Sequence, residues 1–227
     1  MNYLSGAVNF IAAGGIWVIP IIVVGVIGLG IAIERYIIFF RAVRAHRRTW
    51  DEIQPVLHQG DFAKAREITR DDKSALAMLV NVGIENQGVM RRRNDIELAM
   101  EEVMQSIVPQ FQKRVSYLGL LANLATLLGL FGTIVGLIGA FAAVATAAPS
   151  EKSALLSLSI SEAMSCTATG LLIAMPMLTL SLLLNNKAGR IISGLEIAAL
   201  KTLNMIVRAG ATARISNMQD YVQKKAS

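Results

Sequence analysis

One uncharged stretch, residues 118–141, constrains this chain more than any other part of its sequence. It reads LGLLANLATLLGLFGTIVGLIGAF, with Asn123, Thr126 and Thr133 as its polar residues. An apolar run longer than about 18 residues is a candidate transmembrane helix, because a helix satisfies its own backbone hydrogen bonds inside lipid. We therefore expect a membrane helix here, and the rest of the fold has to accommodate it.

The glycines of this stretch predict how the helix packs. Gly132 and Gly136 are four residues apart, and Gly129 lies about one turn before them. Small residues at this spacing let a second helix approach backbone to backbone, where lipid offers no hydrophobic driving force for association. We expect Gly129, Gly132 and Gly136 to be helix-packing positions.

Composition supports an integral membrane protein and argues against several other classes. Apolar residues make up 54% of the 227 residues, and the net charge is +6. The basic residues lie mostly beside the apolar runs, where retention on the cytoplasmic side explains them better than nucleic-acid binding does. His46 and His58 stand alone, Cys166 is the single cysteine, and no nucleophile has an evident base. We expect no metal, no cofactor and no enzymatic activity.

Charge and hydropathy divide the chain into four parts. These are an amino terminus and first span over 1–40, a cytoplasmic helical region over 41–114, a hairpin of two spans over 115–186, and a cytoplasmic helix over 187–227. No charge precedes Glu34, whereas five arginines lie between residues 35 and 48. The positive-inside rule then predicts an amino terminus outside the membrane and a carboxyl terminus in the cytoplasm.

Capping residues predict the helices of the cytoplasmic region. Asp61 follows a glycine and is expected to cap a helix that ends near Arg70, and Ser74 is expected to cap the next one. A third helix, capped by Asn94, is expected to run toward the membrane segment, with Pro109 as the expected place for a kink or break.

The third span carries a single carboxylate, Glu162. A carboxylate inside a membrane is costly and marks a functional site by default, although Glu162 could also be an interfacial residue at the mouth of the helix. At about 100° per residue, the helix face that contains Glu162 is polar. This polar face favours a hydrated path, and the alternative interpretation is that its small polar residues only allow tight helix packing. The residues of this face are Ser159, Glu162, Ser165, Cys166 and Thr169.

Threonines supply further polar groups. Thr126 and Thr133 are seven residues apart and share a helix face, whereas Thr167 lies on a different face from Glu162. A membrane threonine alone often bonds to its own helix backbone. Pro176 in the third span is tolerated where neighbouring helices stabilise a kink.

Two motifs resemble those of the MotA/TolQ/ExbB proton-channel family, most closely its three-span ExbB/TolQ branch. They are LLGLFGTIVGLIGAF over 127–141 and ISEAMSCTATGLLIAMPM over 160–177, with Gly170 and Pro176 in the second. The likeness also covers span order and loop sizes. Two departures are Thr126, where the family pattern has proline, and Ser165 with Cys166, where it has small or aliphatic residues.

The resemblance implies a fold and a function. It implies an all-α pentameric ring with polar residues lining the channel, namely Thr133, Thr167 and Glu162, and we extend this set to Thr126, Ser165 and Thr169. It also implies a single-span partner of the ExbD or TolR type that brings a membrane aspartate, and through it a TonB-like protein. The expected function couples the proton motive force to work across the envelope, with TonB-type import favoured. The resemblance also implies a bacterial inner membrane, with the amino terminus in the periplasm and the carboxyl terminus in the cytoplasm.

Alternatives remain open at the level of the sequence. One is a TolQ-like envelope-maintenance or motility motor. A second, from another class, is a membrane scaffold that conducts nothing, whose glycine-rich spans only assemble and whose cytoplasmic helices recruit partners. The scaffold predicts that replacing polar span residues is harmless, whereas Gly132→Leu is not.

Overall fold

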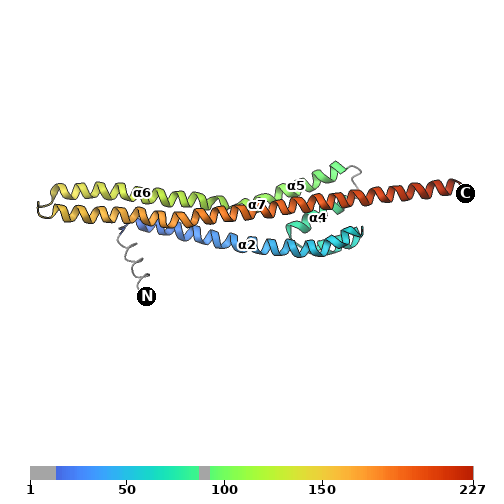
Figure 1. Cartoon of the computed structure of the whole chain (residues 1–227), viewed down its shortest axis with the longest axis horizontal. Helices are drawn as coiled ribbons and strands as arrows, with labels where there is room; N and C mark the ends of the chain where they lie inside the picture. Colours follow the sequence, from blue (N-terminus) through green and yellow to red (C-terminus); the bar gives the residue numbers. More distant parts are fainter. Residues whose placement is uncertain (1–13, 87–92, 227) are drawn as a thin grey trace. The chain divides into compact units, whose positions relative to one another are not determined.

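The protein is helical throughout the part that its structure, a computed structural model, describes: residues 14–86 and 93–226, with side chains described as far as residue 211. No strand occurs in these residues (Figure 1). The helices are α2 (Val18–His58), α3 (Phe62–Arg70), α4 (Ala75–Asn86), α5 (Arg93–Gln112), α6 (Val115–Thr146) and α7 (Lys152–Ala226).

Three stretches of helix are long and apolar enough to cross a membrane. They lie in Val18–His58, Arg93–Thr146 and Lys152–Ala211. The short connection of residues 147–151 joins α6 to α7 in an antiparallel hairpin, which Figure 1 shows as two adjacent rods. The expectation of an all-α protein with three membrane-spanning helices is confirmed for the described residues.

The chain divides into two compact units. The first contains residues up to Tyr36 and Arg114–Asn185, and thus the amino-terminal part of α2, all of α6 and the first part of α7. In α6 the buried positions are mostly small residues at spacings of three or four, which brings this face close to its neighbours: Leu118, Ala122, Ala125, Gly129 and Gly132. The opposite face exposes large apolar side chains such as Leu120, Leu127 and Ile138, as a helix in lipid requires.

The second unit contains Ile37–Lys113 and the part of the chain from Asn186 onward. Its core is built from large side chains, in contrast to the small residues of the first unit. Phe39 and Ile53 of α2 are fully buried, as are Leu76 and Leu79 of α4. The carboxyl-terminal part of α7 contributes a further buried row at helical spacing: Leu195, Thr202, Leu203 and Ile206.

Two predicted helix caps of this unit are confirmed. Asp61 accepts a hydrogen bond from the Lys64 amide at 3.0 Å and begins α3. The Ser74 hydroxyl accepts one from the Ala77 amide at 3.2 Å and begins α4. Gly60, with φ of 75°, ends the preceding helix in a conformation that glycine adopts without steric cost.

Pro109 was the expected place for a kink or a break, and the break does not lie there. Pro109 lies inside α5, which continues to Gln112, and the Lys113 amide still donates to the Pro109 carbonyl at 2.8 Å. The break falls instead at Lys113 and Arg114, where Arg114 has the left-handed φ of 68° and α6 begins at Val115. Proline removes only one helical hydrogen bond, whereas a left-handed residue turns the chain.

Candidate functional site

The candidate site lies in the first unit, where α6 and α7 pack through two glycines. A Cβ added at Gly170 would lie 2.7 Å from the Ala125 carbonyl oxygen and 3.1 Å from Gly129 Cα. A Cβ added at Gly129 would lie 3.2 Å from Thr167 Cα. All of these neighbours are backbone atoms, which cannot rotate away. The two helices therefore touch along their backbones at this level, as small residues in membrane helices permit.

Thr167 links the two helices at the same level. Its hydroxyl donates to the Gly129 carbonyl oxygen at 2.8 Å, and the side chain is half-buried. The Gly129 carbonyl oxygen already accepts a hydrogen bond within the backbone of α6. The Thr167 hydroxyl therefore donates to the second lone pair of this oxygen. The hydroxyl oxygen of Thr167 keeps its own lone pairs for a further donor, such as water.

The other threonines bond within their own helices. Thr133 donates to the Leu130 carbonyl at 2.6 Å and Thr126 to the Ala122 carbonyl at 3.2 Å, and both side chains are partly exposed. Thr169 donates to the Ser165 carbonyl at 2.8 Å and is buried. Thr133 is thus the more accessible hydroxyl at the middle of α6, and Thr169 is enclosed by the chain itself.

The polar face of the third span divides into two parts. Ser165, Cys166 and Thr169 are buried inside the unit, whereas Glu162 is exposed. A Cβ added at Gly132 would overlap the Cys166 sulfur, so this pair is in close contact. The buried part of the face serves packing within one chain, and the part near Glu162 stays open to other groups.

Glu162 borders a cavity of about 260 Å³ between the start of α2 and the hairpin. Its carboxylate lies directly against Gly15, which has a φ of 68°. Trp17 and Gly132 also line the cavity, and the Trp17 ring meets Phe131 edge-on with the centroids 4.9 Å apart. The structure thus brings Glu162 together with Ser159 and Gly136 at this cavity.

Sequence reasoning missed Gly15 as a neighbour of Glu162. Gly15 precedes α2, and the two positions are 147 residues apart in the chain. No local pattern links them, because their contact depends on how α2 starts against α7. The positive φ at Gly15 is the one feature that marks the position, and a sequence does not display it.

An ionic cluster lies elsewhere in the first unit. Glu34 pairs with Arg35 at 3.3 Å and with Arg114 at 2.7 Å. Arg35 is only 6% exposed, so its charge is neutralised inside the protein rather than in water. Burying an arginine requires such a partner, because an isolated charge would carry a large desolvation cost. This cluster fixes Arg114, whose left-handed backbone separates α5 from α6.

The geometry therefore defines a class: a multi-pass membrane protein with accessible polar groups on a closely packed helix hairpin. No group of metal-binding side chains occurs in the described residues. The model of the MotA/TolQ/ExbB proton channel family matches residues 71–197, more than half of the chain. The chain belongs to this family, whose members act as proton-channel and motor subunits and not as catalytic enzymes. A comparison with curated proteins finds no match.

The matched range contains the polar residues of both motifs. It includes Thr133, Thr167 and Glu162, together with Gly129 and Gly170. It leaves out all of α2 and the residues before it, including Gly15 and Trp17, which the structure places beside Glu162. The family thus supplies the kind of function, and the structure supplies the surroundings of the carboxylate.

Proposed function

We propose that this protein is the ring-forming subunit of a proton-driven motor of the ExbB/TolQ branch in a bacterial inner membrane. In this proposal several copies, five by analogy with the branch, surround the membrane helices of an ExbD- or TolR-like partner that carries the proton-accepting aspartate. A TonB-like protein and import across the outer membrane are the favoured output. Envelope maintenance and motility are the alternatives within the same architecture.

The accessible positions of Thr133 and Glu162 carry this proposal. Between Lys152 and Lys187, Glu162 is the only charged residue, and α6 has none. A hydroxyl and a carboxylate that face outward from a single chain in membrane helices are costly in lipid, so they favour a protein or water neighbour. Hydroxyls hold water near a partner's carboxylate without competing for its charge.

The proton gradient supplies enough energy to move a partner inside the ring. One proton crossing the membrane releases about 2.3 kcal/mol per 100 mV of potential, before the pH gradient is added. This energy moves the partner only if protonation changes its contacts with the ring. The proposal assigns Thr133, Thr167 and Glu162 to the ring side of those contacts, with Thr126, Ser165 and Thr169 as supporting positions.

The test measures proton flux in liposomes that contain the purified chain, with and without its co-expressed short membrane partner. We expect flux only with the partner present, and Thr133→Val to reduce it by roughly tenfold or more, since the hydroxyl that holds water is lost. Thr179→Val is the matched control, because Thr179 also donates to its own helix, at 3.0 Å to the Met175 carbonyl.

The outcomes separate the proposal from the scaffold. Full flux in Thr133→Val would remove this hydroxyl from the pathway. No flux with any single-span partner, combined with normal assembly, would favour the scaffold. We expect Glu162→Ala to reduce flux less than Thr133→Val does, and unchanged flux there would make Glu162 an interfacial residue.

A further inference from the structure

Two grooves of opposite charge flank α7 in the second unit. The basic groove, of about 490 Å³, lies between α2 and α7. Its charged residues are Arg47, Lys187, Arg190 and Lys201, and no carboxylate lines it. Arg47, Arg190 and Lys201 form no salt bridge within the described residues; Lys201 instead lies over the Trp50 ring at 5.8 Å. Arg47, Arg190 and Lys201 therefore give the groove a positive charge that no described salt bridge neutralises.

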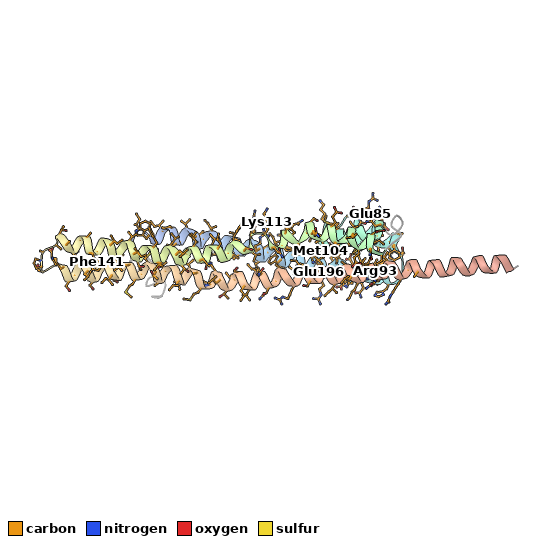
Figure 2. All side chains as sticks on the ribbon, turned by 90° about the horizontal axis from the view of Figure 1, so that it is seen from above. Glu85, Arg93, Met104, Lys113, Phe141 and Glu196 are labelled. Atoms are coloured by element: carbon orange, nitrogen blue, oxygen red, sulfur yellow. The ribbon has the colours of Figure 1, made fainter. Side chains whose placement is uncertain are left out.

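The acidic groove, of about 660 Å³, lies between α5 and α7 (Figure 2, where Met104 and Glu196 are labelled). Its charged residues are Glu97, Glu101 and Glu196, and no cation lines it. Glu97 has a loose, exposed pair with Arg93 at 3.9 Å, which is worth little. Met100 and Met104 form part of the floor, and methionines adapt to varied partners.

Each groove also exposes an apolar side chain of α7. Ile197 in the basic groove is 54% exposed, and Leu200 in the acidic groove is 49% exposed. These residues lie beyond Lys187, where the apolar run of the third span has ended. Apolar side chains beside charged grooves are typical of an interface between proteins.

The two grooves point in different directions from the same helix. At 100° per residue, the stripe of Arg190, Gly194, Ile197 and Lys201 lies about 120° from that of Glu196, Leu200 and Leu203. The buried face of α7, with Leu195 and Thr202, lies between them on the side that packs into the unit. One subunit thus has a basic flank and an acidic flank, and the two exposed apolar residues differ by only about 4.5 Å along the helix.

We propose that the basic groove of one copy of this chain binds the acidic groove of the next copy. A contact between two different, complementary surfaces is heterologous, and it closes into a ring when successive copies do not climb along the axis. The offset of about 4.5 Å between Ile197 and Leu200 along α7 is small, so successive copies in contact would climb little. A bound lipid would neutralise only the basic groove, whereas a second copy covers both grooves and both apolar side chains. This inference rests on the proposed ring and specifies the contact that the ring makes outside its membrane spans.

Cross-linking tests the contact in the full chain. In a Cys166→Ala background, Ile197→Cys and Leu200→Cys are made in two differently tagged versions, co-expressed in membranes and treated with a short bismaleimide. We expect a covalent dimer that carries both tags. We expect little product from either version alone, because a heterologous contact does not bring a residue close to the same residue of the neighbouring copy. As a control, Glu67→Cys, an exposed residue on α3, replaces Leu200→Cys and is expected to give little product.

Charge reversal tests whether complementarity drives the contact. We expect Glu97→Lys/Glu101→Lys to lower the yield of the mixed dimer by roughly fivefold or more, because both grooves are then positive. Arg47→Glu/Lys201→Glu should do the same, because the basic groove then has no net charge to attract the acidic one. Combining the four substitutions in one chain sets opposite charges at the reversed positions again and should recover part of the yield. Arg70→Glu/Lys73→Glu makes the same charge change as the basic-groove variant at exposed positions outside both grooves and should leave the yield unchanged.

The failure of this inference differs from the failure of the proposed function. If detergent-solubilised protein is oligomeric by light scattering but the mixed dimer does not form, the ring stands and the groove contact is wrong. If the protein is monomeric with its partner present, the ring fails and the groove contact fails with it. Equal yields in the acidic-groove and Arg70/Lys73 variants would also overturn the contact.

Discussion

At the scale of single residues, Gly170 sets the distance between α6 and α7. The nearest atoms to a Cβ at this position are backbone atoms of Ala125 and Gly129, at 2.7 and 3.1 Å. We expect Gly170→Ala to force the helices apart and to destabilise the protein by about 2 kcal/mol, within the usual range for overpacking. Thermal unfolding in detergent measures this, and Gly139→Ala is the control because its Cβ would meet no atom within 4 Å. An equal effect of both changes would contradict the close contact.

Thr167 combines two roles that substitution separates. Its hydroxyl bridges to the Gly129 carbonyl, and the proposed pathway uses its remaining lone pairs. We expect Thr167→Val to lose about 1 kcal/mol of stability with the hydrogen bond and most of the partner-dependent proton flux. Thr167→Ser keeps the hydroxyl and should retain both. If Thr167→Ser lost flux as completely as Thr167→Val, the methyl group rather than the hydroxyl would be the important feature.

At the scale of elements, Asp72 joins α2 to the start of α4. Burial by itself would raise the pKa of Asp72, but hydrogen bonds from Thr49 and Ser74 and the charge of Arg48 outweigh it, so the pKa lies below its ordinary value. A carboxyl with a lowered pKa in the folded state contributes stability above its unfolded pKa of about 4, and that contribution is lost as pH falls through the folded value.

Asp72→Asn tests this junction. At neutral pH we expect the substitution to cost about 1 kcal/mol of the free energy of unfolding, because the hydrogen bonds to the charged carboxylate weaken. The difference from the natural protein should shrink as pH falls below about 4, where Asp72 becomes neutral as well. Unfolding curves in detergent across this pH range measure it. A difference that stays constant would mean that the charge of Asp72 does not stabilise the fold.

Particular elements show how far the sequence predicts this structure. Asp61 and Ser74 were predictable as caps because the signal is local: a polar side chain bonds to an amide three residues on. The break at Arg114 was not predictable, because arginine rarely adopts a left-handed φ and its pairing with Glu34 spans 80 residues. The polarity of Thr167 was evident, but its partner, Gly129, depends on the register between two helices.

At the scale of the whole molecule, the distribution of basic residues predicts orientation. The stretch 34–114 contains 14 lysines and arginines, whereas the connection between α6 and α7 contains none before Lys152. We expect the α6–α7 connection to lie outside the cell membrane and the second unit to lie in the cytoplasm. In a Cys166→Ala background, Ser150→Cys should react with a membrane-impermeant maleimide in spheroplasts, and Gln59→Cys should react only after lysis. The reverse pattern would invert the topology and place both charged grooves outside.

The contact between Gly15 and Glu162 has a consequence for how the family varies. Two separate constraints exclude a side chain at position 15: the backbone there has a φ of 68°, and the carboxylate fills the space that a Cβ would need. The second constraint exists only while an acid stands at position 162. Homologues that have exchanged this acid for a small residue should therefore tolerate asparagine in place of the glycine, while those that keep the acid should not. Covariation between the two positions would then trace, across many genomes, where the carboxylate has been kept.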